Sequence, residues 1–145
     1  MVFERPLRAT HHCRHYSYNN PISHPQAGPQ CAVGCVFDEP GSIGRCMPEP
    51  RGECSKREEY TDAEREAWEA AKHASMERLC NAVQALPEAI PLRSGGNIEC
   101  PNCGGTLRFD RWHGGAEIKC STPHCCEAHF SIAAGRDWPS RKAKP

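Results

Sequence analysis

Residues 100–126 read CPNCGGTLRFDRWHGGAEIKCSTPHCC, and the cysteines in this stretch decide how the surrounding chain folds. Cys100 and Cys103 form a C-x-x-C pair, and a second cysteine cluster begins at Cys120. A C-x-x-C pair followed after about 15–20 residues by a second pair is typical of zinc sites. The spacing therefore predicts that the two cysteine clusters bind one zinc ion between them.

The residues between the two clusters predict a β-hairpin. Residues 106–110 and 116–119 alternate apolar and polar side chains, and the sequence HGG at 113–115 marks a turn. The apolar positions of the two strands share one face: Leu107, Phe109, Ala116 and Ile118. At the first cluster, Gly104 and Gly105 let the backbone turn so that both thiolates face one ion. A hairpin with a cysteine pair at each end is a zinc ribbon.

Either of two adjacent cysteines could be the fourth ligand of this site. Cys125 and Cys126 follow each other, and successive side chains diverge, so only one of them completes the site. We choose Cys125, and His124 and His129 remain nearby alternatives. The predicted ligands are Cys100, Cys103, Cys120 and Cys125.

A second metal site is predicted in residues 1–60. This segment holds five cysteines among Pro, Gly and Asn and has little periodic hydrophobicity, so it is expected to be loops and short turns. A segment this rich in loops needs a crosslink or a bound metal ion to be ordered. Its thiolates are therefore expected to bind a second zinc ion. The predicted ligands are Cys13, Cys31, Cys46 and Cys54. His15 or Cys35 is an alternative for one of them, and an iron–sulfur cluster is the alternative occupant.

A long helix is predicted over residues 61–86. Thr61 and Glu64 form a capping box, and Pro87 ends the pattern. Apolar or small residues recur at spacings of three and four and form one face: Trp68, Ala71, Ser75, Leu79, Ala82, Val83 and Leu86. We expect this face to brace the N-terminal region or to pair with a second copy as a homodimer.

The remaining boundaries follow from composition. Residues 87–98, with two prolines and the sequence SGG, are expected to be a hinge. The ribbon then occupies residues 99–138, with a third strand near Phe130 and Ile132 and with Trp138 folded back onto it. Residues 139–145 are a basic tail.

Overall composition predicts a small α+β protein that metal ions stabilise. The chain has 145 residues, 38% hydrophobic content and thirteen prolines, which is too poor in core-forming residues for one large apolar core. Eleven cysteines without an apolar signal-peptide core in residues 1–8 predict reduced thiols in the cytoplasm. No apolar run approaches the roughly 18 residues that a membrane span needs.

The sequence predicts a protein that is not an enzyme. It contains no H-E-x-x-H motif, no deaminase-type H-x-E with P-C-x-x-C, and no phosphate-binding loop. A catalytic zinc also keeps one coordination position for water, whereas the ribbon offers at least four sulfurs.

Nucleic-acid binding and protein binding remain as functions. Around the hairpin, Trp112 is expected to stack on a base, and cationic side chains are expected to contact phosphates: Arg108, Arg111 and Lys119. The net charge of zero argues against a strong, nonspecific complex. The alternative is an adaptor or inhibitor of a host bacterial protein, because Trp and Arg are enriched at the centres of protein interfaces.

The ribbon resembles the zinc-ribbon superfamily in its four cysteine positions. Within that superfamily, IECPNCGGTLRFD and EIKCSTPHCC are similar to the small zinc-finger translational activator of Mu-like phages, which implies mRNA binding. More broadly, the Cys-rich head with C-x-H-Y at 13–16, the KREEYTDAERE start of the helix and the ribbon resemble uncharacterised small proteins of temperate phages and prophages. This resemblance implies a phage-encoded regulatory protein that acts in the bacterial cytoplasm.

Overall fold

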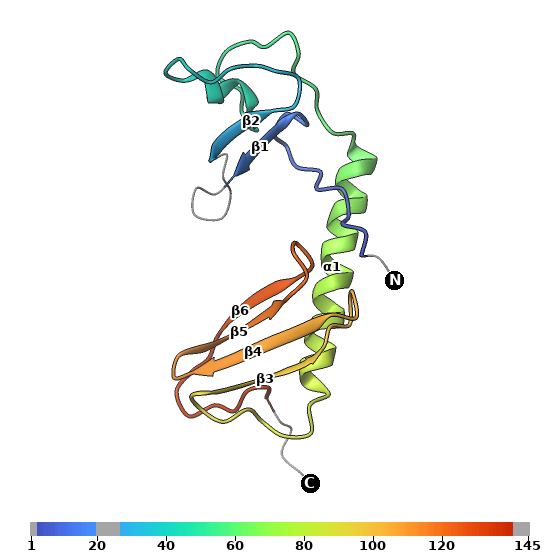
Figure 1. The fold of residues 1–145 in the computed structure, drawn as a ribbon, viewed down its shortest axis with the longest axis vertical. Coiled ribbons are helices and arrows are strands. Elements are labelled where there is room, and N and C mark those ends of the chain that lie inside the picture. Colours follow the sequence, from blue (N-terminus) through green and yellow to red (C-terminus); the bar gives the residue numbers. More distant parts are fainter. Residues whose placement is uncertain (1–2, 20–26, 141–145) are drawn as a thin grey trace. The chain divides into compact units, whose positions relative to one another are not determined.

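The computed structural model describes residues 3–19 and 27–140 and shows a small α+β protein. In this described part there are one α-helix and two β-sheets (Figure 1). The elements in chain order are β1 (Tyr16–Asn19), β2 (Gly28–Cys31), the short 3-10 helix η1 (Ser42–Cys46), α1 (Asp62–Gln84), β3 (Ser94–Glu99), β4 (Thr106–Trp112), β5 (Gly115–Cys120) and β6 (Glu127–Ser131). Residues 141–145 of the predicted basic tail lie outside the described residues.

The chain divides into two compact units. The N-terminal unit is Leu7–Glu69, and the C-terminal unit is Met1–Pro6 together with Ala70–Pro145. The division therefore falls inside α1, whereas the sequence places its boundaries at the two ends of the helix.

The helix α1 begins at the predicted capping box. The Glu64 amide donates to Thr61 Oγ1 at 3.1 Å, and the Thr61 amide donates to Glu64 Oε1 at 2.9 Å. Hydrogen bonds from the Thr61 amide and the Arg14 guanidinium hold the pKa of the Glu64 carboxyl below its usual value. A carboxylate in the first turn also suits the positive end of the helix dipole. The last helical residue is Gln84, because Pro87 follows three residues later and prevents further helix.

The C-terminal unit contains a four-stranded antiparallel sheet in the order β3-β4-β5-β6 (Figure 1). The predicted hairpin is present as β4 and β5, with Phe109 opposite Ile118 in the register. The predicted third strand is present as β6. Burial alternates along β4, so one face of the sheet is buried and the other faces solvent.

The strand β3 lies largely within the segment that the sequence assigns to a hinge. Its glycines allow β3 to pack closely against β4 and do not provide the flexibility of a linker. A Cβ atom on Gly95 would lie 2.6 Å from the Phe109 carbonyl oxygen, and one on Gly96 would lie 2.7 Å from Phe109 Cζ. Only glycine lets β3 approach β4 this closely. The glycines that resemble those of a linker are therefore needed for β3 to pair with β4 at the edge of the sheet.

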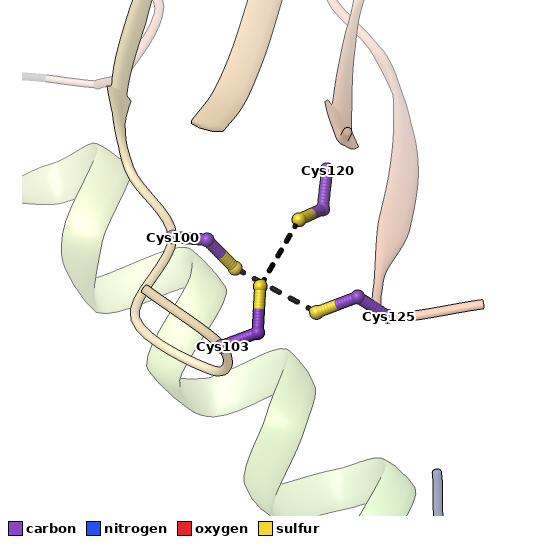
Figure 2. Close-up of side chains that lie close together, drawn as sticks. All are labelled: Cys100, Cys103, Cys120 and Cys125. Carbon is purple, nitrogen blue, oxygen red and sulfur yellow. Dashed lines mark hydrogen bonds between the residues drawn. The ribbon is translucent and has the colours of Figure 1, made fainter. Parts of the chain in front are cut away.

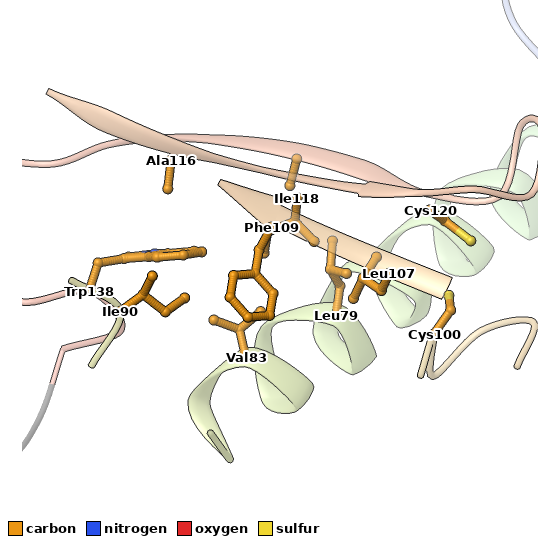
Figure 3. Close-up of a cluster of buried hydrophobic side chains, with 11 residues drawn as sticks. Leu79, Val83, Ile90, Cys100, Leu107, Phe109, Ala116, Ile118, Cys120 and Trp138 are labelled. Atoms are coloured by element: carbon orange, nitrogen blue, oxygen red, sulfur yellow. The ribbon is translucent and has the colours of Figure 1, made fainter. Parts of the chain in front are cut away.

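The apolar core of the C-terminal unit lies between α1 and the buried face of the sheet (Figure 3). Leu79 and Val83 project from α1 onto Leu107, Phe109 and Ile118, and all but Phe109 and Val83 are fully buried. Trp138 folds back onto the sheet as predicted, with its ring 5.5 Å from that of Phe130. The chain's own sheet thus covers the part of the helix face that the sequence offers to a second copy.

The described part of the N-terminal unit has almost no apolar core. Its buried residues are Ala9, Cys13, Ser42 and Cys46. Strands β1 and β2 form a two-stranded antiparallel sheet, and the rest is turns and loops, as the sequence predicts. Backbone hydrogen bonds join distant segments, as in the Cys13 amide donating to the Cys46 carbonyl at 3.0 Å.

The position of Leu79 at the centre of the helix–sheet contact gives a stability prediction. Leu79→Ala leaves a cavity and is expected to lower the free energy of unfolding by about 2–5 kcal/mol. Cys80→Ala is the matched control, because Cys80 lies one residue along α1 and is exposed; its expected effect is within about 0.5 kcal/mol. Urea unfolding followed by circular dichroism measures both, and equal effects would contradict this packing.

Candidate metal centre

Four cysteines from three segments of the C-terminal unit meet at one point. Cys100 and Cys103 lie in the turn between β3 and β4, Cys120 ends β5, and Cys125 lies in the turn before β6. Their four sulfur atoms all lie within 4.8 Å of one another. Figure 2 shows these side chains pointing toward a common centre. These are the four ligands that the sequence predicts for the ribbon.

The sulfur–sulfur distances fit a metal site and exclude a disulfide. Cys103 Sγ lies 3.4 Å from Cys120 Sγ, and Cys100 Sγ lies 3.7 Å from Cys125 Sγ. A disulfide bond is about 2.05 Å long. Four sulfurs bound to zinc at about 2.3 Å in a tetrahedron are about 3.8 Å apart. The thiols are therefore already close to the spacing of a tetrahedral thiolate site.

The first cysteine pair is shaped by the glycines that follow it. Gly104 has φ of 77°, and its amide donates to the Cys100 carbonyl at 2.9 Å. The Gly105 amide donates to Cys103 Sγ at 3.4 Å. A Cβ atom on Gly105 would lie 2.9 Å from Thr122 Oγ1, so glycine is needed there because of crowding. The turn thus directs a backbone N–H group at one of the four sulfurs.

Thr122 supports the second cysteine pair, and the sequence analysis does not identify it. Its amide donates to Cys120 Sγ at 3.4 Å, and its hydroxyl lies 3.2 Å from Cys103 Sγ. The pKa of the Cys103 thiol is lowered to about 6, mainly by the hydrogen bond with the Thr122 hydroxyl and further by the one from the Gly105 amide. A lowered pKa favours the thiolate, which is the form that binds metal ions.

Two other thiols of the group, those of Cys120 and Cys125, have raised pKa values. Burial raises the pKa of Cys120 and of Cys125, and the neighbouring sulfurs of Cys100 and Cys103 raise both further. A second thiolate next to the first is unfavourable because like charges repel at short range. A divalent cation removes this penalty, and four thiolates are the ligand set that zinc or iron prefers.

The geometry distinguishes Cys125 from its neighbour Cys126. Cys125 belongs to the group of four, whereas Cys126 does not. Cys126 Sγ instead lies at the edge of the group, 3.7 Å from Cys100 Sγ and 3.8 Å from Cys125 Sγ. His124 and His129 are not in the group either, and His129 is exposed with its Nε2 4.0 Å from Glu117 Oε1.

A polar contact fixes the first cysteine pair to the helix. Asn102, between the two cysteines, accepts a hydrogen bond from Arg78 Nε at 2.6 Å and donates to Ser75 Oγ at 3.0 Å. Both partners lie on α1 within the C-terminal unit. The helix that covers the apolar core therefore also positions the metal site. The sequence gives no signal for this contact, because it joins residues far apart in the chain.

The structure places the four predicted binding residues of the ribbon in different environments. Arg108 is exposed and its Nε lies 3.0 Å from Asp110 Oδ2. Lys119 is exposed and its Nζ lies 3.9 Å from Glu127 Oε2. Arg111, in contrast, is buried, and its Nη2 donates to the Arg136 carbonyl at 3.0 Å. Arg111 is therefore part of the interior and does not face a phosphate, contrary to expectation.

Trp112 is half-exposed and lies on the solvent face of the sheet. It is 44% exposed and sits opposite Gly115 in the β4–β5 register. A Cβ atom on Gly115 would lie 3.1 Å from Trp112 Cζ2, so the indole lies directly over the glycine. The absence of a side chain at Gly115 makes room for this ring position.

The predicted N-terminal ligands are brought together less tightly. Cys13, Cys31, Cys46 and Cys54 line one small cavity, which Cys35 also lines. They do not form a group within 4.8 Å, and in the described residues the ribbon cysteines are the only such group.

The positions of Cys125 and Cys126 predict different zinc contents when each is replaced by serine. Cys125→Ser is expected to remove the ribbon's zinc, because Cys125 completes the group of four. Cys126→Ser is the matched control and is expected to keep that zinc. Zinc content of each purified variant, measured by elemental analysis against the wild type, checks this prediction. A loss of zinc in Cys126→Ser with retention in Cys125→Ser would contradict the ligand assignment.

Comparison of the chain with models of known protein families gave no match. Searches for similar curated proteins and for similar solved structures gave none either. Among the described residues, no helix combines the length and apolar character that crossing a membrane requires. The arrangement of side chains described above is therefore the basis for a functional proposal.

Proposed function

We propose that the C-terminal unit is a zinc ribbon whose single structural zinc ion is bound by Cys100, Cys103, Cys120 and Cys125. The observation that carries this proposal is the convergence of four sulfurs within 4.8 Å. The backbone amides of Gly105 and Thr122 each donate to one of these sulfurs, which is the support that metal-bound thiolates need.

The proposed role of this zinc is structural. Four protein sulfurs fill a tetrahedral coordination shell, and a catalytic zinc instead keeps one position for water or substrate. The ion would join the β3–β4 turn, the end of β5 and the turn before β6 at the end of the sheet. The ribbon then serves as a rigid support for a recognition surface and not as an active site.

The proposed recognition surface is the solvent face of the sheet around Trp112. The indole is half-exposed yet held over Gly115, so little side-chain freedom remains to be lost when it is covered. Exposed tryptophans of this kind are enriched among the residues that contribute most to protein–protein binding.

A protein partner suits this surface better than a nucleic acid. Each exposed cation of the predicted binding set lies beside a carboxylate, Arg108 by Asp110 and Lys119 by Glu127. Glu117 is also on this face, opposite Asp110 in the register. Phosphate binding needs cations that carboxylates do not offset. We therefore propose that the protein acts by binding another protein, as an adaptor or inhibitor.

Nucleic-acid binding remains the second candidate because of Trp112 itself. An exposed indole can stack on an unpaired base, which contributes about 1–3 kcal/mol. The resemblance of the ribbon to a phage translational activator favours single-stranded RNA as the ligand. In either case we propose a phage or prophage regulatory protein acting in the bacterial cytoplasm.

A pair of variants with equal exposure tests the recognition surface. Trp112→Ala is expected to lose partner binding and keep zinc. Met76→Ala is the matched control, because Met76 is 43% exposed and lies on α1. The measurement is recovery of one nuclease-resistant protein from bacterial lysate by immobilised protein. A partner lost with Trp112→Ala and kept with Met76→Ala is the expected result, and equal recovery on both variants would contradict the role of Trp112.

Titration with labelled single-stranded RNA and DNA at two salt concentrations separates the two candidates. A protein-binding ribbon is expected to show no binding at micromolar concentration and physiological salt. If the ribbon binds nucleic acid, its phosphate contacts should come from Arg108 and Lys119, the exposed cations of the predicted set. The logarithm of the binding constant should then fall by about 0.7 per phosphate contact for each log unit of salt, or roughly 1.4 for the two contacts. Binding with such a slope, lost in Trp112→Ala, would favour the second candidate.

A further inference from the structure

The N-terminal unit lacks the usual source of stability for a folded unit. Within its described residues the buried set is two cysteines, one alanine and one serine. The apolar core of the chain consists of residues of the C-terminal unit. A unit of this size without an apolar core needs a disulfide or a metal ion to be ordered, and its cysteines are all free thiols.

Five cysteines of this unit line one cavity: Cys13, Cys31, Cys35, Cys46 and Cys54. They come from separate segments, since Cys31 ends β2, Cys46 ends η1, and Cys13 precedes β1. Backbone hydrogen bonds hold these segments together, including one from the Ala32 amide to the His15 carbonyl at 2.9 Å. The fold thus brings five metal-binding side chains to one place.

The loop after Cys31 directs backbone donors at a sulfur. The amides of Val33, Gly34 and Cys35 hydrogen-bond the Cys31 thiol, and Gly34 has φ of 84°, which glycine adopts freely. A turn of amides around one sulfur is the same device that the ribbon uses at Cys103 and Cys120.

Two of the five cysteines are buried and three are half-buried. Cys13 and Cys46 are the buried two, and the Cys13 amide donates to the Cys46 carbonyl at 3.0 Å. Cys31, Cys35 and Cys54 are half-buried and line the same cavity. Cys13 and Cys46 are therefore the two least exposed of the possible ligands.

Two other groups of the unit bear on the choice of ligands. His15, a possible replacement for Cys13, has its Nε2 3.0 Å from Glu58 Oε2 and does not line the cavity. Arg45 and Lys56 do line it. Zinc with four thiolates carries a net charge of −2, and these two cations offset that charge.

The cavity has room for a single ion. Its volume is about 10 Å³, which is about the space that one water-sized sphere occupies. The aromatic ring of Tyr16 lines the same cavity and packs edge-on against Phe37, with ring centres 6.3 Å apart, so an apolar wall limits its expansion.

We propose that the N-terminal unit binds one zinc ion of its own through four of the five cysteines that line its cavity, with the buried Cys13 and Cys46 among the ligands. This site is independent of the proposed ribbon and of its recognition function, since none of its residues lies in the C-terminal unit. The ion would tie β2, η1 and the segments before β1 and α1 together in a unit that has little else to hold it.

Zinc content of full-length variants tests this proposal. The wild type is expected to carry two zinc ions per chain and Cys46→Ser one. Cys103→Ser is expected to carry one, which shows separately that the ribbon site contributes the other ion. Elemental analysis and native mass spectrometry of each variant give the counts.

Cobalt substitution checks the ligands even if a variant folds poorly. In Cys103→Ser, where only the N-terminal site should remain, bound Co²⁺ is expected to give the absorption of a tetrahedral thiolate site. Adding Cys46→Ser should abolish that spectrum. One zinc in the wild type, retention of two ions in Cys46→Ser, or iron and sulfide in the purified protein would each overturn the proposal.

Discussion

The meeting of four cysteine sulfurs at the end of the sheet is the constraint on which the C-terminal unit depends. Thiolates this close repel one another, and burial raises the pKa of Cys120 and Cys125 further, so the arrangement is favourable only around a cation. The glycines of the first turn, the amide and hydroxyl of Thr122, and the contact of Asn102 with α1 all position these sulfurs. The sheet and helix thus hold four sulfurs where a metal ion could bind.

The two units reach stability by different means. In the C-terminal unit, burial of Leu79, Leu107 and Ile118 supplies an apolar core beside the cysteines. In the N-terminal unit, the cavity lined by cysteines takes the place of such a core. Loss of the two proposed ions should therefore unfold the N-terminal unit more completely than the C-terminal unit, whose helix and sheet still bury apolar surface against each other.

Patterns within short stretches of sequence predicted several features of the fold. Cysteine spacing predicted the four grouped sulfurs, and the Thr61–Glu64 capping box predicted the start of α1. Strand β3 was missed because its glycines resemble a linker and are explained only by their contact with Phe109. The burial of Arg111 was missed although it shares strand parity with Leu107 and Phe109. Thr122 and Asn102 act through tertiary contacts that no local pattern shows.

X-ray absorption at the zinc edge of the purified full-length protein tests the central claim most directly. The account predicts a zinc environment of four sulfurs at about 2.3 Å, with no lighter ligand. A nitrogen or oxygen ligand at about 2.0–2.2 Å in the first shell would show that the cysteines do not close the site, and it would contradict a structural four-thiolate zinc.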